Sequence, residues 1–149
     1  MKVRQEGDEK RTYDPDGLTR RASCLCFRDE TEKEILLITS TSDACKWLVP
    51  GGGINAGEEP KDAAVREARE EAGVVGIVGR LLGIFENKDK KTRTWVFAFY
   101  VKQLEDQWAE AKIRKRQWHN LADAKRILQV HKPIQATYIS VMDGTNEPS

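Results

Sequence analysis

The sequence has few of the residues that build disulfide scaffolds, zinc centres or membrane spans. Its 149 residues include three cysteines and two histidines, and no C-x-x-C pair occurs. We therefore expect Cys24, Cys26 and Cys45 to be reduced thiols rather than metal ligands or redox partners. The longest apolar stretch, residues 74–85, is interrupted by Arg80 and is shorter than the roughly 20 residues that cross a membrane. No membrane span is expected.

Neither sign of charge dominates the chain. Lysine and arginine total 25 and aspartate and glutamate total 24, which leaves a formal net charge of +1. Binding of a polyanion through overall charge is thereby excluded, so any such binding must depend on local clusters. A hydrophobic share of 39% with a mean hydropathy of −0.63 is typical of a soluble globular protein.

The length fits a single domain, because domains of roughly 100 to 150 residues are the commonest. Both ends of the chain are polar, so we expect flexible tails over residues 1–10 and 143–149. Between them, residues 11–142 are expected to fold as one monomeric domain. The amino-terminal segment lacks the apolar core of a secretory signal, so we expect the protein in the cytoplasm, or in the cytoplasm and the nucleus.

The order of the apolar patterns predicts an α+β fold. Strands are expected at alternating or β-branched apolar runs, and helices where apolar residues recur at helical spacing. Pro60 and Gly73 are placed to begin and end the central helix. The order of elements indicates an α/β/α sandwich rather than a doubly wound βαβ sheet. The expected strands are residues 21–27, 34–39, 47–49, 75–85, 94–101 and 113–117, and the expected helices are residues 60–72, 121–128 and 133–141.

The central helix carries three carboxylates on one edge. At 100° per residue, Glu67, Glu70 and Glu71 fall within an arc about 100° wide, beside an alanine stripe suited to packing on a sheet. Like charges at these spacings repel one another, and Arg66 alone cannot balance all three. Hard oxygen ligands on one rigid element suit Mg²⁺ or Mn²⁺. The alternative interpretation is a solvated acidic helix edge.

The residues that precede the helix favour the metal site. Glycines at positions 51–53 let the backbone approach a ligand closely, although a glycine triplet alone predicts only a turn that ends a strand. Together with the helix they form the pattern G-x5-E-x7-R-E-U-x-E-E-x-G-U, where U is a bulky aliphatic residue. In this respect the chain resembles the Nudix hydrolases, with Ala68, at the first U, as the one departure. The matching positions are Gly52, Glu58, Arg66, Glu67, Glu70, Glu71, Gly73 and Val74.

The resemblance implies a fold, a reaction and a role for each acid. The fold would be a Nudix-type sandwich with a mixed central sheet and a catalytic loop-helix-loop, and the reaction would be the attack of water on a phosphoanhydride with Mg²⁺ or Mn²⁺ as cofactor. Glu67 and Glu71 would bind the metal with help from the Gly51 carbonyl. Arg66 would orient the carboxylates, and Glu70 would be the general base. From the spacing alone, any of the three glutamates fits the role of the base.

Three cationic clusters indicate a densely phosphorylated substrate. Residues 88–93 and 112–116 each contain four basic residues, and a third cluster lies among residues 10–21. One such cluster is typical of a solvated loop or a charged edge strand. Three of them, in a domain whose central helix is acidic, favour separate binding of metal and polyanion.

A similarity to one branch of the Nudix hydrolases extends over residues 11–141. The segments 13–17, 47–53, 83–87 and 130–138 resemble the diphosphoinositol polyphosphate phosphohydrolases. That branch removes the β-phosphate of inositol pyrophosphates as orthophosphate and also hydrolyses long-chain diadenosine polyphosphates. By this resemblance, the substrate phosphates would contact Arg11, Thr19, Arg20, Arg21, Ser40, Thr41, Ser42, Lys90, Lys91, Thr92, Arg114 and Lys132.

Two other functions fit the same residues. A nucleotide-directed Nudix pyrophosphatase, acting on dinucleoside polyphosphates or an mRNA cap, would need one of the four tryptophans to stack a base, whereas core packing is the commoner role of tryptophan. An inactive polyanion-binding module need not retain Glu67, Glu70 and Glu71 together. The expected partner is therefore a small polyphosphate, with capped RNA as the one nucleic acid to consider.

Overall fold

A computed structural model of the chain describes residues 11–143. The sequence predicts tails at residues 1–10 and 143–149. Residues 1–10 and 144–149 lie outside the described residues, whereas Asp143 is the last residue of the final helix and not part of a tail. No helix within the described range is long and apolar enough to cross a membrane. Cys24 and Cys26 are buried free thiols and Cys45 is an exposed one.

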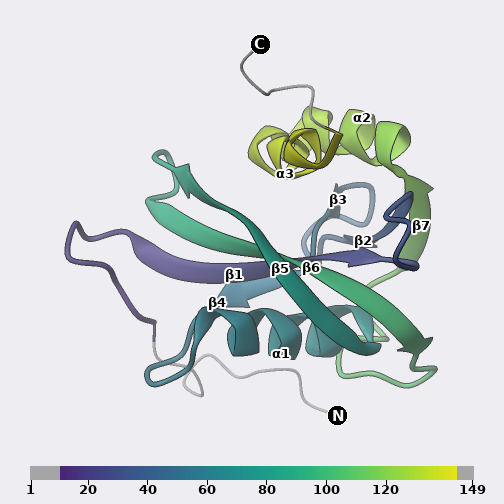
Figure 1. The fold of residues 1–149 in the computed structure, drawn as a ribbon, viewed down its shortest axis with the longest axis horizontal. Coiled ribbons are helices and arrows are strands. Elements are labelled where there is room, and N and C mark those ends of the chain that lie inside the picture. The colour runs from purple at the N-terminus through teal and green to yellow at the C-terminus, as the bar shows by residue number, and fades with distance from the viewer. Residues whose placement is uncertain (1–10, 144–149) are drawn as a thin grey trace.

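Within residues 11–143, seven strands form one mixed sheet with helices on both faces (Figure 1). The central strand β1 pairs in parallel with β6 and antiparallel with β2 and β4. Strand β5 pairs antiparallel with β6 at one edge, and β3 and β7 both pair with β2. Helix α1 covers one face, and α2 and α3 cover the other. The elements are β1 (Thr19–Phe27), β2 (Glu34–Thr39), β3 (Trp47–Leu48), β4 (Gly51–Gly53), α1 (Pro60–Ala72), β5 (Val74–Asn87), β6 (Thr92–Leu104), β7 (Arg116–Asn120), α2 (Leu121–His131) and α3 (Pro133–Asp143).

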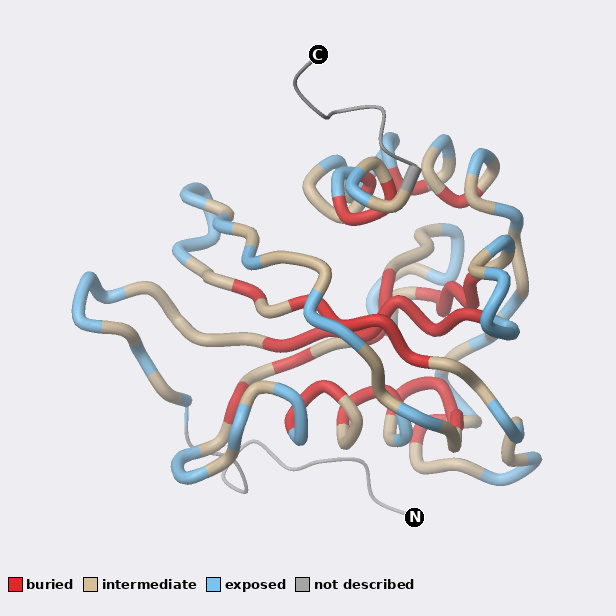
Figure 2. Tube along the Cα trace, in the orientation of Figure 1, coloured by how far each residue is buried: buried red, intermediate tan, exposed pale blue. Residues whose placement is uncertain are grey.

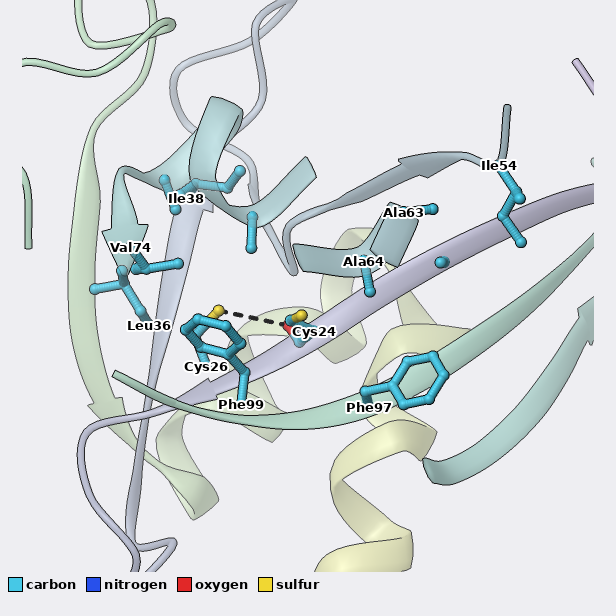
Figure 3. Close-up of a cluster of buried hydrophobic side chains, with 13 residues drawn as sticks. Cys24, Cys26, Leu36, Ile38, Ile54, Ala63, Ala64, Val74, Phe97 and Phe99 are labelled. Atoms are coloured by element: carbon cyan, nitrogen blue, oxygen red, sulfur yellow. Dashed lines mark hydrogen bonds between the residues drawn. The ribbon is translucent and has the colours of Figure 1, made fainter. Parts of the chain in front are cut away.

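The central strands are buried on both faces because successive side chains point to opposite layers. In β1, Cys24 and Cys26 pack in the cluster beneath α1, whereas Leu25 and Phe27 pack in the cluster against α2 and α3. Figure 2 shows this burial along the middle of the sheet and on the inner side of α1, and Figure 3 shows the cluster beneath α1. The two cores confirm the predicted α/β/α sandwich.

Helix α1 lies close to the sheet because its packed face consists of alanines. Ala64, Ala68 and Ala72 are fully buried, so the small residue at position 68 fits this close approach. Pro60 occupies the first turn, and Gly73 ends the helix with a left-handed φ of 68° and donates its N–H to the Arg69 carbonyl at 3.0 Å. Both predicted helix ends are confirmed.

Two predicted segments differ from the structure. The glycine triplet does not simply end a strand, because Gly51–Gly53 is itself the short strand β4, paired with β1. The strand predicted at residues 113–117 begins only at Arg116. Residues 113–115 lie in the preceding loop, where the Arg114 N–H bonds to the Glu110 carbonyl at 3.1 Å and the Lys115 N–H bonds to Thr39 Oγ1 at 2.8 Å.

Candidate active site

The sequence predicts that the three helix carboxylates share one edge of α1, beside the face that packs on the sheet. In the structure, two of the three are buried. Glu67 is 0% exposed and Glu71 is 3% exposed, whereas the Glu70 side chain is 32% exposed. Glu67 and Glu71 are four residues apart, so they lie on the same side of α1, and both face strand β4. A plain solvated acidic edge is therefore wrong for Glu67 and Glu71.

The glycines of β4 allow the two carboxylates to lie directly against the backbone. The Gly51 N–H donates to Glu71 Oε1 at 2.9 Å. A Cβ atom added at Gly52 would lie 2.3 Å from Glu67 Oε2, which is far below a possible contact distance. Gly52 thus provides space for the Glu67 carboxylate, in addition to any freedom of the backbone.

Arg66 connects the acidic helix to the loop that precedes it. Its Nε donates to Glu58 Oε2 at 2.8 Å, and its Nη2 donates to the Gly53 carbonyl at 3.0 Å. Its Nη1 lies 3.1 Å from Glu67 and 3.6 Å from Glu70. Glu58 is held in turn by the Asn55 N–H at 3.0 Å. Arg66 is therefore placed to orient two of the three helix acids.

The electrostatics of the buried pair favour a bound cation. Burial, followed by the neighbouring Glu67 carboxylate, raises the pKa of Glu71 to about 8 despite the opposing effects of Arg114 and the Gly51 N–H. The Arg114 guanidinium lies 3.6 Å from Glu71 and 2.5 Å from the buried Glu110, so this one arginine faces two carboxylates.

This donor set fits a hard dication. Within residues 11–143, no three histidine, cysteine, aspartate or glutamate side chains form a complete metal centre. Mg²⁺ nevertheless needs few protein ligands, since it is usually bound through one or two carboxylates together with water and substrate phosphates. Glu67, Glu71 and the Gly51 carbonyl would supply such a partial set, and the dication would relieve the repulsion between the two acids.

A glutamine at position 71 is expected to stabilise the metal-free protein. With its pKa raised from 4.5 to about 8, Glu71 keeps a proton in the folded state that the unfolded chain releases, so the wild type loses stability as the pH rises through that interval. Glutamine carries no charge and can still accept the Gly51 N–H bond. In a chelator at about pH 9, we expect Glu71→Gln to raise the melting temperature by roughly 5 to 10 °C, and by little at about pH 5.

Melting curves with and without Mg²⁺ complete this test. The wild type should regain stability on addition of Mg²⁺, whereas Glu71→Gln should not. Glu59→Gln, at an exposed glutamate that precedes the same helix and makes no side-chain cap bond, serves as the control. If the melting temperatures of the wild type and Glu71→Gln changed with pH in the same way, that result would contradict the raised pKa of Glu71.

A cationic cleft of about 370 Å³ opens beside β4. Its walls come from the starts of β1 and β6, the loop after β2, the β5–β6 turn and the start of α3. Most of the predicted substrate-binding residues meet here, next to Glu71 and the glycines of β4. Those that line it are Arg11, Thr19, Arg21, Ser40, Thr41, Lys90, Thr92, Arg114 and Lys132.

A second cleft of about 660 Å³ adjoins the first and shares several of its walls, including Arg21, Lys90 and Lys132. Ser42, also predicted, lines this second cleft. The pKa of Lys132 is lowered, first by burial and then by repulsion from Lys90, Arg21 and Lys46. Converging cations that repel one another form a site for a multiply charged anion.

Arg20 and Lys91 line neither cleft. Neighbouring strand residues face opposite sides, so Arg20 points away from Arg21; it lies 3.2 Å from Asp14, with its guanidinium over the Trp95 ring. Lys91 is exposed in the β5–β6 turn with a φ of 59°.

The predicted general base also lies away from the cationic cleft. Glu70 and Arg66 border a separate, open groove of about 980 Å³, together with Val65, Val78 and Trp108. Glu70 is nevertheless tied to the buried pair, because Arg66 lies within 3.6 Å of both Glu67 and Glu70.

The sequence did not identify Gln135, Lys46 or Glu110. Gln135 lines both clefts and accepts the Val49 N–H at 2.8 Å, and Lys46 lines the second cleft. Gln135 lies three residues after Lys132 at the start of a predicted helix, and this spacing could have indicated a shared face. Glu110 gives no such signal, because its burial depends on the fold of the loop before β7.

The chain belongs to the NUDIX domain family, which matches residues 17–139. It is 48% identical over 145 residues to diphosphoinositol polyphosphate phosphohydrolase 3-alpha of Mus musculus, across 95% of this chain and 88% of that protein. It is 50% identical over 134 residues to diphosphoinositol polyphosphate phosphohydrolase 2 of Homo sapiens, across 89% and 74% of the two chains.

The fold is similar to that of a crystallised C. elegans Ap4A hydrolase in a binary complex. The TM-score is 0.65 at 20% identity, over 84% of this chain and 95% of that one. The predicted Nudix-type sandwich, with a mixed sheet and an acidic loop-helix-loop, is confirmed.

Proposed function

We propose that the protein hydrolyses the phosphoanhydride of diphosphoinositol polyphosphates with Mg²⁺ or Mn²⁺ and releases orthophosphate. The observation that carries this proposal is the cationic cleft, whose lysines and arginines surround a buried carboxylate at the glycine strand. The names of the relatives that are 48% and 50% identical support the same substrate class. We further propose activity on long-chain diadenosine polyphosphates, as a monomer in the cytoplasm or nucleus.

The proposed roles come from the family resemblance and are supported in part by where the groups lie. Glu67, Glu71 and the Gly51 carbonyl would hold the metal, which would supply charge neutralisation at the phosphate oxygens and a more acidic water when bound. Arg66 holds Glu67 and Glu70 in fixed relation through its Nη1 atom. The role of Glu70, to accept the proton of the attacking water, rests on the family resemblance, because Glu70 borders the separate groove rather than the cationic cleft. The cations of the cleft bind the remaining phosphates and position the scissile bond.

An inositol polyphosphate fits the cleft better than a nucleotide does. None of the four tryptophans lines either cationic cleft, and the aromatic side chains that remain for stacking a base, Phe85 and Tyr138, line the second cleft and not the first. Trp108 borders only the separate groove and donates its indole N–H to the Glu71 carbonyl at 3.0 Å. The cations, in contrast, come from five segments of the chain and surround the ligand space. We therefore keep the nucleotide-directed activity as the second candidate.

Loss of one cleft cation should separate the two substrates. We expect Lys90→Gln to raise the KM for diphosphoinositol pentakisphosphate about tenfold, since a charge-assisted hydrogen bond is lost. The KM for diadenosine hexaphosphate should rise less. Lys88→Gln, in the same turn but outside both clefts, is the matched control. Orthophosphate release with Mg²⁺ measures both substrates.

The same assay tests the proposed function. No orthophosphate release from diphosphoinositol pentakisphosphate by the wild type would overturn it. Faster turnover of diadenosine hexaphosphate, with an equal effect of Lys90→Gln on both substrates, would favour the nucleotide-directed candidate.

A further inference from the structure

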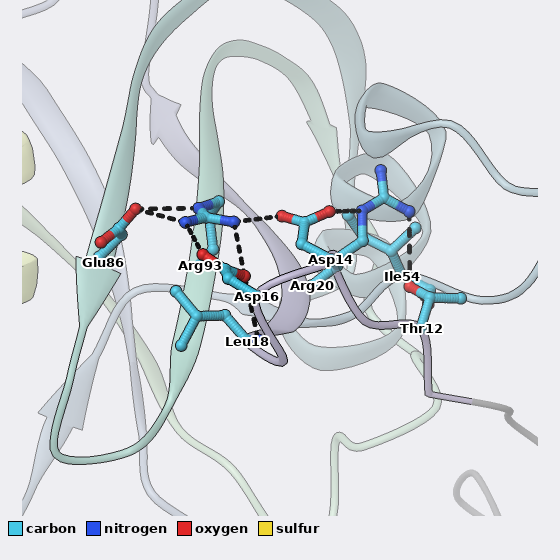
Figure 4. Close-up of polar contacts among 8 residues, drawn as sticks. All are labelled: Thr12, Asp14, Asp16, Leu18, Arg20, Ile54, Glu86 and Arg93. Atoms are coloured by element: carbon cyan, nitrogen blue, oxygen red, sulfur yellow. Dashed lines mark hydrogen bonds and ion pairs between the residues drawn. The ribbon is translucent and has the colours of Figure 1, made fainter.

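Arg93, the second residue of β6, is surrounded by three carboxylates (Figure 4). Its guanidinium donates to Asp14 at 2.6 Å, to Asp16 at 2.7 Å and to Glu86 at 2.6 Å. Asp14 also pairs with Arg20 at 3.2 Å. We call Arg93, Asp14, Asp16 and Glu86 the Arg93 cluster. The Arg93 guanidinium is paired within the protein, so Arg93 is not one of the cations available to a ligand. Three carboxylates against the two guanidiniums of Arg93 and Arg20 leave a formal charge of −1.

The cluster lies behind the cationic cleft. In the parallel pairing of β1 with β6, Thr19 is opposite Thr92 and Arg20 is opposite Arg93. Thr19 and Thr92 line the cleft, so Arg20 and Arg93, one residue further along each strand, face the other side of the sheet. The ends of the two strands thus carry the cleft on one face and the cluster on the other.

The cluster also joins segments that are far apart in the sequence. Asp14 and Asp16 belong to the arm at residues 11–18, whose turn is closed by the Asp14 N–H to the Leu18 carbonyl at 3.0 Å. Glu86 belongs to β5. The arm supplies Arg11 to the cleft, and the turn after β5 supplies Lys90. Arg93 therefore holds the arm, which carries Arg11, close to the end of β5, whose following turn carries Lys90.

We infer that Arg93 is a positioning residue that fixes Arg11 of the arm and Lys90 of the β5–β6 turn on one substrate site. This inference rests on the proposed role of the cleft in binding a polyphosphate. Cations brought together around an empty cleft repel one another, and three carboxylates behind the strands offset that repulsion. A site ordered before the ligand arrives loses less conformational entropy on binding.

The cluster differs from an ordinary surface ion pair. The Arg93 side chain is 18% exposed and bonds to carboxylates of two separate segments. Arg80, by comparison, is 53% exposed and forms an ion pair with one acid, Glu32, at 2.7 Å. Exposed single pairs contribute little to stability, whereas networks that order several segments contribute more. Arg80 lines neither cationic cleft, which makes it a matched control.

The test compares Arg93→Gln, Asp16→Asn, their double variant and Arg80→Gln. Binding is measured by calorimetry with inositol hexakisphosphate, which has no phosphoanhydride and reports binding alone, and turnover is measured with diphosphoinositol pentakisphosphate. We expect Arg93→Gln to raise both Kd and KM about tenfold with kcat within about twofold. Asp16→Asn should act in the same direction, and the double variant should bind no worse than Arg93→Gln, because both remove one network. Arg80→Gln should match the wild type.

Other results would overturn the inference. These are an unchanged Kd in Arg93→Gln, a loss of kcat without a change in KM, additive effects in the double variant, or equal effects of Arg80→Gln. If Arg93→Gln does not fold, Asp16→Asn carries the same comparison. If the wild type fails to hydrolyse the pyrophosphate, the proposed function fails, while the Kd values still test the positioning role.

Discussion

Glu70→Gln is expected to lower kcat by about 10² to 10⁴-fold, the usual contribution of a general base, while Mg²⁺ affinity stays within about twofold. Glutamine preserves the size of the side chain but cannot accept the proton of water. Glu70 is also the most exposed of the three helix acids and lies outside the buried pair, so its loss should leave the metal ligands in place.

Variants of the buried acids Glu67 and Glu71, unlike Glu70→Gln, should affect metal binding more than the catalytic rate. Glu67→Ala and Glu71→Ala are expected to lose metal affinity first, with activity partly restored by excess Mg²⁺ or Mn²⁺. Glu59→Gln is the matched control. Titration calorimetry with each metal, beside steady-state kinetics, makes the comparison. Equal loss of metal affinity in all three acid variants would make Glu70 a ligand, and full activity of Glu70→Gln would place the base elsewhere.

Gly52→Ala is expected to lower kcat/KM by about 10²-fold or more, because a displacement near 1 Å at a catalytic site has effects of that size. The added Cβ would fall 2.3 Å from Glu67 Oε2 and 2.4 Å from its Cδ, so the carboxylate must move. The Mg²⁺-dependent rise in melting temperature should shrink in parallel.

Gly57→Ala separates this displacement from a general loss of stability. Gly57 has a φ of 81° and open space where a Cβ would lie, so alanine there strains the backbone by about 1 to 2 kcal/mol without touching an acid. It should lower the melting temperature and leave kcat/KM near the wild-type value. Normal kinetics in Gly52→Ala would show that the Glu67 carboxylate needs no fixed place.

Local patterns predicted the elements whose causes are local. Pro60 and Gly73 bound α1 as expected, because their backbone preferences act at the position itself. Strand β4 was not predicted, because glycine has a low strand propensity and its pairing is with β1, about 30 residues earlier in the chain, where Ser23 is opposite Gly51. The loop at residues 113–115 likewise depends on a distant partner, Thr39 of β2, in addition to the nearby Glu110 carbonyl.

In the candidate site, too, features with local causes were predictable from the sequence, and features that depend on distant contacts were not. Helical spacing placed three acids together, but it could not indicate that Glu67 and Glu71 are buried, since the Gly51 N–H and Arg114 contact Glu71, and Gly52 lies against Glu67, from distant parts of the chain. The positions of Arg11 and Lys132 in one cleft came from the family resemblance, not from spacing. Strand alternation, applied to Arg20 and Arg21, would have placed the two residues on opposite faces.

The distribution of the three cysteines has a practical consequence. Cys24 and Cys26 are sealed in the core beneath α1, whereas Cys45 is exposed beside Lys46, a residue of the second cleft. A thiol-reactive fluorophore would therefore attach to the unaltered protein at one defined position. The fluorescence of this label would follow the binding and release of an anionic ligand at the second cleft in real time, without a chromogenic substrate.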